Sequence, residues 1–120
     1  MNKKKLLIVD DEDGIVEELV DFFQAEGYEV HSAATGEEAI QALRAQSPHL
    51  AMIDLKLPDM SGLLVLKVAK DINPRIKVIV NTGYVDQNLV DQAEQLGCDV
   101  FLHKPYDLLR LKEEIDRLVA

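Results

Sequence analysis

Carboxylate side chains stand at two points of the sequence where a short apolar run ends. Asp10 and Asp11 follow the run Leu6–Val9, and Asp54 follows the run Leu50–Ile53. Carboxylates that lie close together raise one another's pKa values unless a cation offsets their charge. Mg²⁺ suits that role, because it prefers oxygen ligands and keeps waters and phosphate oxygens beside one or two carboxylates. The three acids are therefore candidate ligands of Mg²⁺, or of Mn²⁺ as an alternative.

A hydroxyl group and an ammonium group follow two later apolar runs. Thr82 and Gly83 come after Ile76–Val80, and Lys104 comes just after the last run. A lysine ammonium can contact a phosphoryl group as a point charge, a threonine hydroxyl can donate a hydrogen bond to it, and glycine leaves backbone space. Beside Asp54 these groups would suit a carboxylate that attacks phosphorus and forms an aspartyl phosphate.

Apolar runs alternate with helical patterns along the whole chain, which predicts the elements that position these side chains. We expect strands at Leu6–Val9, Tyr28–Ser32, Leu50–Ile53, Ile76–Val80 and Val100–Leu102, with a helix after each of the five. This alternation is typical of an α/β fold, a doubly wound five-stranded parallel sheet. The common strand order is 2-1-3-4-5, which is called flavodoxin-like, and ligands then bind at the carboxyl ends of the strands.

The composition excludes several classes of function. The net charge is −9, and no Lys or Arg occurs from Leu6 to Leu43, so we expect no nucleic-acid contact and no anionic membrane partner. The length of 120 residues supports one domain spanning residues 1–120. The single cysteine, Cys98, cannot form an internal disulfide. Four apolar residues near the N-terminus are too few for a signal peptide or a membrane span, so we expect a cytoplasmic protein.

Taken together, these residues resemble the receiver domain of two-component response regulators, from about Lys4 to Val119. The resemblance rests on the acid pair, on Asp54 with the loop that runs to Gly62, on Thr82, on Phe101 and on Lys104-Pro105. No single one of these features is specific, but all five in the right order at strand ends are.

The resemblance implies a role for each site residue. Asp54 would be the phosphoacceptor, and Mg²⁺ would be bound by Asp11 and Asp54 directly, by the main-chain carbonyl of Lys56, and by Asp10 mostly through water. Thr82, Gly83 and Lys104 would contact the phosphoryl group, and Thr82 and Phe101 would form the switch. Pro105 would follow a cis peptide bond. The Lys56 side chain either reaches over the phosphoryl group or is an ordinary surface lysine.

The resemblance also implies partners. The phosphoryl donor would be a histidine kinase or a histidine phosphotransfer protein, and the acceptor would be a signalling switch with no turnover substrate. Phosphorylation would alter the surface of the fourth helix, fifth strand and fifth helix, which would control an output domain or effector and would suit a homodimer. On the first helix, Val16, Val20 and Phe23 lie at the margin of a wide apolar arc and are candidates for kinase docking; the alternative is that neighbouring elements cover them.

Two other functions compete with this interpretation. The segment Asp11-Glu12-Asp13-Gly14 resembles the nucleophile motif of haloacid-dehalogenase-type phosphatases, in which Asp11 would take the phosphate. That motif begins at the strand end, where Asp10 already stands, and the chain is short for such a fold with its cap. The third possibility is a degenerate receiver that acts only as a binding scaffold, which the complete set of site residues disfavours.

Overall fold

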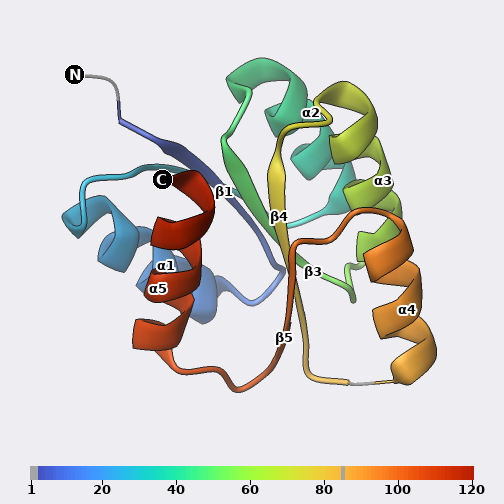
Figure 1. Cartoon of the computed structure of the whole chain (residues 1–120). Coiled ribbons are helices and arrows are strands. Elements are labelled where there is room, and N and C mark those ends of the chain that lie inside the picture. Colours follow the sequence, from blue (N-terminus) through green and yellow to red (C-terminus); the bar gives the residue numbers. More distant parts are fainter. Residues whose placement is uncertain (1–2, 85) are drawn as a thin grey trace.

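The computed structural model describes residues 3–84 and 86–120. Its elements follow one another as strand and helix in strict alternation (Figure 1). The strands are β1 (Lys5–Val9), β2 (Glu29–Ala33), β3 (Leu50–Asp54), β4 (Lys77–Thr82) and β5 (Val100–His103). The helices are α1 (Asp13–Ala25), α2 (Gly36–Gln46), α3 (Gly62–Ile72), α4 (Gln87–Gln95) and α5 (Leu108–Val119).

The five strands form one parallel sheet in the order β2-β1-β3-β4-β5. The predicted α/β doubly wound fold and its strand order are therefore confirmed. In this order β1 and β3 are direct neighbours although α1, β2 and α2 separate them in sequence. Their carboxyl ends meet at one edge of the sheet, which is the place where this topology binds ligands.

Helices cover both faces of the sheet (Figure 1). α1 and α5 pack on one face through buried Leu19, Phe23, Leu111 and Ile115. α2, α3 and α4 pack on the other face through buried Leu43, Leu66, Ala93 and others. Because both faces are covered, the central strands are mostly apolar, and every residue of β3 is buried.

Local sequence signals set where the helices begin and end. Thr35 caps α2 by accepting a hydrogen bond from the Glu38 amide at 3.1 Å. Gly27, just after α1, has a φ of 97°, a left-handed conformation that glycine adopts without steric cost. Asn73 ends α3, and Pro74 after it cannot continue the helix. Among the described residues, no helix is long and apolar enough to cross a membrane.

Several strand bounds differ from the prediction by one or two residues. β3 includes Asp54, and β4 runs from Lys77 through Asn81 to Thr82 rather than ending at Val80. The ladder explains the difference: Asp54 pairs with Asn81, and Thr82 pairs with His103. The polar residues at this edge are thus held by sheet pairing, which fixes their backbone more firmly than a loop would.

Candidate functional site

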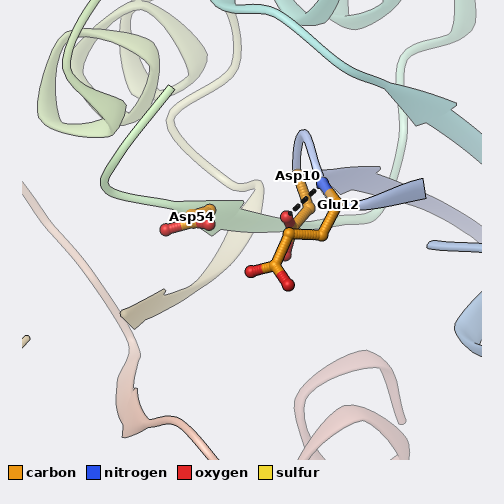
Figure 2. Close-up of side chains that lie close together, drawn as sticks. All are labelled: Asp10, Glu12 and Asp54. Atoms are coloured by element: carbon orange, nitrogen blue, oxygen red, sulfur yellow. Dashed lines mark hydrogen bonds between the residues drawn. The ribbon is translucent and has the colours of Figure 1, made fainter. Parts of the chain in front are cut away.

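Asp10 and Asp54 lie at the carboxyl ends of the two central strands, β1 and β3. Both are buried, with exposed fractions of 2% and 5%. The Asp10 amide donates to the Ala33 carbonyl at 3.1 Å, so the backbone there still follows β1. Figure 2 shows the two side chains at the ends of adjacent strands, and one carboxylate oxygen of Asp10 lies within 4.8 Å of one of Asp54. Two carboxylates this deeply buried need a compensating cation.

Glu12 joins these two aspartates, although no metal-binding or phosphoryl-contacting role was predicted for it. Its amide donates to Asp10 Oδ1 at 3.0 Å, which folds the chain back after β1 (Figure 2). One carboxylate oxygen from each of Asp10, Glu12 and Asp54 lies within 4.8 Å of the others. The signal was present in the sequence, because an acid two positions after a strand-end aspartate can turn back to the same edge.

Lys104, the residue directly after β5, supplies a cation. Its Nζ lies 2.9 Å from Asp10 Oδ2, 3.0 Å from Asp54 Oδ2 and 3.4 Å from Glu12 Oε1. The Lys104 amide donates to the Thr82 carbonyl at 2.8 Å, which fixes the root of its side chain to β4. The peptide bond between Lys104 and Pro105 is cis. One ammonium therefore joins the ends of three strands.

Burial and hydrogen bonding act against each other on the titratable groups. Burial raises the pKa of Asp54 above its ordinary value of 3.8, and hydrogen bonds from the Lys56 amide and from Lys104 offset only part of this rise. Burial lowers the pKa of Lys104, but its hydrogen bonds to Asp10 and Asp54 outweigh this effect and raise the pKa above the ordinary lysine value. Lys104 is thus firmly charged, while Asp54 carries a charge that the fold accommodates poorly.

A cavity of about 500 Å³ opens over Asp54. It is lined by Asp11, Glu12, Asp54, Lys56, Leu57, Pro58, Thr82, Gly83, Tyr84 and Lys104. Six of the seven residues that were predicted to contact the metal or the phosphoryl group therefore line one cavity. Asp10 lies beneath it and does not line it, whereas Asp11 is exposed at its edge.

Thr82 and Phe101 lie on the same face of the sheet as the apolar side chains that α2, α3 and α4 cover. Thr82 is buried, and its Oγ1 accepts a hydrogen bond from the Tyr84 amide at 3.1 Å. Phe101 pairs with Val80, two residues before Thr82, and packs against the core while half-buried. The hydroxyl and the ring are thus diagonal neighbours on adjacent strands.

The candidate docking residues of α1 differ from the prediction. Phe23 is completely buried, and its ring packs edge-to-face against Phe22 and Tyr28. Its assignment to a docking surface was wrong, because α5 and Tyr28, the residue before β2, cover the part of the apolar arc on which it lies. Val16 and Val20 are half-buried against the same core and remain partly accessible.

The donor set fits the metal that the sequence predicts. The ligand atoms at the cavity are carboxylate oxygens from neighbouring strands, with no cysteine or histidine in the described cluster. Mg²⁺ takes such oxygen ligands while retaining waters, and the open cavity leaves room for them. The arrangement is compatible with Mg²⁺ binding.

Comparisons with known proteins agree with this geometry. Residues 6–116 match the family described as "Response regulator receiver domain". The sporulation initiation phosphotransferase F of Bacillus subtilis (strain 168) is 33% identical over 117 residues, which cover 98% of this chain and 94% of that protein. In two longer relatives the matched part is only 24% and 25% of the relative's length.

Solved structures show the same likeness. A CheY-like response regulator receiver domain protein from Methanospirillum hungatei JF-1 superposes with a TM-score of 0.90 at 34% identity, covering 98% of this chain and 97% of that one. In the CheX–CheY–BeF₃–Mg²⁺ complex from Borrelia burgdorferi, the matching chain has a TM-score of 0.89 at 25% identity, with coverages of 98% and 90%. The family match over residues 6–116 shows that this chain belongs to the response regulator receiver domain family of two-component signalling, and the 2-1-3-4-5 sheet and the acid cluster at the strand ends agree with it.

Proposed function

We propose that the chain, as a single receiver unit over residues 1–120, accepts a phosphoryl group on Asp54 and passes the signal on as a change of surface. The observation that carries this proposal is the contact of Asp54 with Lys104 at 3.0 Å, on the floor of an open cavity. A buried carboxylate that faces an ammonium group and an open cavity is placed to react with an anionic donor. Its backbone in β3 holds it there.

The transfer takes a phosphoryl group from a phosphohistidine of a histidine kinase or of a phosphotransfer protein. Asp54 attacks phosphorus, the P–N bond breaks as a P–O bond forms, and the histidine nitrogen keeps the bonding electron pair and takes up a proton from water. Lys104 keeps its contact with Asp54, the acceptor, and stabilises negative charge on the phosphoryl oxygens. Thr82 and the backbone at Gly83 lie across the cavity and would contact the same oxygens.

Mg²⁺, or Mn²⁺ in its place, would be held by Asp11, Asp54 and the Lys56 main-chain carbonyl, with Asp10 acting through water. The ion would offset the negative charge that gathers on the transferred group. The ion pairs support a direct metal-binding role for Asp11. Lys104 already contacts Asp10, Glu12 and Asp54, whereas no ion pair of the described residues involves Asp11. Asp11 is therefore the acid that a metal can bind without displacing Lys104.

The switch would consist of Thr82 and Phe101. When the phosphoryl group draws the Thr82 hydroxyl away from the Tyr84 amide, space opens beside the half-buried Phe101 ring on the adjacent strand. A turn of that ring would shift the population between two packings of α4, β5 and α5. An output domain or effector would bind that surface, and exposed Leu109 on α5, with an exposed fraction of 64%, would suit a homodimer.

Docking of the donor would use the accessible part of α1. Val16 and Val20 supply an apolar edge there. Their helix neighbours Ile15 and Leu19 line a cavity of about 490 Å³, together with Glu12, Lys104 and residues of the β5–α5 connection. Glu12 and Lys104 line both this cavity and the one over Asp54. A helix seated here would therefore lie next to the acceptor.

Incubation with acetyl phosphate and Mg²⁺ tests the proposal. Intact-mass analysis should show one added phosphoryl group that hydroxylamine removes, and Asp54→Asn should abolish it. Peptide mapping that placed the group on Asp11 would support the phosphatase alternative. A wild-type chain that binds Mg²⁺ yet takes no phosphate would support the scaffold alternative and overturn the proposal.

A further inference from the structure

The loop between β3 and α3, residues 55–61, forms one wall of the site and is closed at its base. The Leu55 amide donates to the Asn81 carbonyl at 3.1 Å, and the Gly62 amide donates to the Leu55 carbonyl at 2.8 Å. The base is tight: a Cβ added to Gly62 would lie 2.2 Å from the Asp54 carbonyl oxygen. Lys56 and Ser61 pair across the loop as an isolated bridge.

The far end of this loop is attached to a different part of the chain. Asp59 Oδ1 accepts a hydrogen bond from the Gly36 amide at 2.8 Å, and Asp59 Oδ2 accepts one from the Glu37 amide at 3.0 Å. These amides are the first two of α2. The adjacent Met60 side chain packs directly on Gly36, where an added Cβ would lie 2.3 Å from Met60 Cγ. A side chain at position 36 would therefore displace the Met60 side chain from this contact.

The contact serves two elements at once. The first amides of a helix have no partner within the helix, and Thr35 satisfies only that of Glu38. Asp59 satisfies two others from 23 and 22 positions away. The hydrogen bonds from Gly36 and then Glu37 also hold the pKa of Asp59 below its usual value of 3.8, so its carboxylate stays ionised at the positive end of α2.

We propose that Asp59 is a positioning residue, which anchors the tip of the β3–α3 loop on α2 and thereby holds the Lys56 backbone in place for metal binding beside Asp54. The proposal rests on the proposed function, in which the Lys56 carbonyl is a metal ligand. Buried Leu57 supports the middle of the loop, while Lys56, Pro58 and Asp59 are exposed. Without Asp59, the exposed part of the loop would be tied mainly by the bridge between Lys56 and Ser61.

A simple helix-capping role for Asp59 is the competing explanation. Thr35 makes the two distinguishable, because it caps the same end of α2 and does not touch the loop. Thr35→Ala and Asp59→Ala should both weaken α2, and the free energy of unfolding in urea measures that shared effect. Only Asp59→Ala should also release the loop.

The experiment compares wild type, Asp59→Ala, Asp59→Asn and Thr35→Ala in the full chain. NMR measures hydrogen exchange at the amides of Lys56 and Gly62, and amide shifts measure Mg²⁺ affinity. For Asp59→Ala we expect faster exchange at both amides and a Mg²⁺ affinity about tenfold weaker, the size typical of losing a residue that orients a metal ligand. Asp59→Asn keeps one acceptor oxygen and should fall between wild type and alanine. Thr35→Ala should leave the exchange of both amides and the Mg²⁺ affinity near wild type.

Equal changes in Thr35→Ala and Asp59→Ala would overturn the proposal and leave Asp59 as a helix cap. Unchanged exchange at Lys56 in Asp59→Ala would overturn it as well. The exchange comparison needs no phosphorylation, so it decides the anchoring role separately from the proposed function. Failure of acetyl phosphate to modify wild type would instead count against the proposed function, which the loop measurement does not address.

Discussion

Lys104 Nζ lies 2.9 Å from Asp10 Oδ2, across 94 positions of sequence. The contact joins the end of β5 to the end of β1, with β4 and β3 between them in the sheet. The exposed fraction of the side chain is 2% for Asp10 and 14% for Lys104. The protein thus carries its own counter-charge for the acids at this edge, and the strength of that arrangement can be measured.

Replacing Lys104 by methionine should destabilise the fold at neutral pH. The change keeps the apolar stem but leaves Asp10 and Asp54 without their cation, and breaking a buried ion pair from one side is costly. We expect a loss of about 2 kcal/mol in the free energy of unfolding, below the range for fully enclosed pairs because the cavity admits water. Urea unfolding monitored by circular dichroism measures the loss, which added Mg²⁺ should reduce.

Lys67→Met is the matched control. Lys67 pairs with Asp71 at 3.1 Å on α3, and both side chains are more than half exposed. Exposed pairs of this kind contribute little, so the control should unfold nearly as wild type does. If the two variants lost equal stability, the Lys104 contacts would have no special energetic role.

The pH dependence of stability should reflect the raised pKa of Asp54. A carboxyl group with a higher pKa in the folded state holds its proton more tightly there, so stability falls as pH rises from 3.8 through the folded value and stays reduced above it. Asp54→Asn cannot ionise and avoids this loss. In metal-free buffer the variant should melt higher than wild type at pH 7, and the difference should vanish near pH 3. A difference that grew toward acid pH would contradict the assigned direction.

Asp11 and Glu12 should contribute unequally to metal affinity. Glu12 already contacts Lys104 at 3.4 Å, whereas Asp11 is exposed at the cavity edge and makes no ion pair among the described residues. We expect Asp11→Asn to weaken Mg²⁺ binding by about tenfold or more, and Glu12→Gln to weaken it by less, because a direct ligand counts for more than an outer carboxylate. Isothermal titration of both variants decides this. A larger loss in Glu12→Gln would reassign the direct ligand to Glu12.

Most of the fold was predictable because the two periodicities of the chain are clear. Short apolar runs closed by Asp10, Asp54 and Lys104 mark parallel strands, and the topology then places those residues at one edge. What a pattern cannot show is which side of a helix a distant element covers. Phe23 lies on a wide apolar arc, and only the packed structure shows that α5 and Tyr28 enclose it.

Contacts between elements that are far apart in the sequence could not be predicted from the sequence either. From the sequence alone, Asp59 is an ordinary acidic residue of a loop. Its hydrogen bonds from the Gly36 and Glu37 amides depend on how α2 and the β3–α3 loop meet in space. The role of Glu12 was equally hard to predict from the sequence, because its place beside Asp10 depends on the turn after β1. Spacing predicts elements, whereas these roles arise where elements that are far apart in sequence touch.

Phe23→Ala should act through the core. The ring is completely buried, and removing a buried aromatic side chain costs about 3–5 kcal/mol. We therefore expect a large drop in melting temperature, together with equal loss of phosphorylation from a kinase and from acetyl phosphate near that temperature. Val20→Ser, at the accessible edge, should slow only the kinase reaction. Full stability of Phe23→Ala would contradict the packing described for α1.

Asn81→Leu should stabilise the protein. Asn81 is 1% exposed near the carboxyl end of β4, between β3 and β5, and its side-chain Oδ1 has no hydrogen-bond partner among the described residues. A buried acceptor without a partner costs about 1–3 kcal/mol, so an apolar side chain of similar volume should raise the free energy of unfolding by about 1 kcal/mol. Asn73→Leu provides the contrast, because Asn73 Oδ1 accepts from the Arg75 amide at 3.0 Å and its loss should destabilise. Urea titrations of both variants measure the two effects. If Asn81→Leu proved destabilising while phosphorylation at Asp54 also slowed, the amide would have a partner at the site that the free chain does not display, and Asn81 would belong with the residues that support the acceptor.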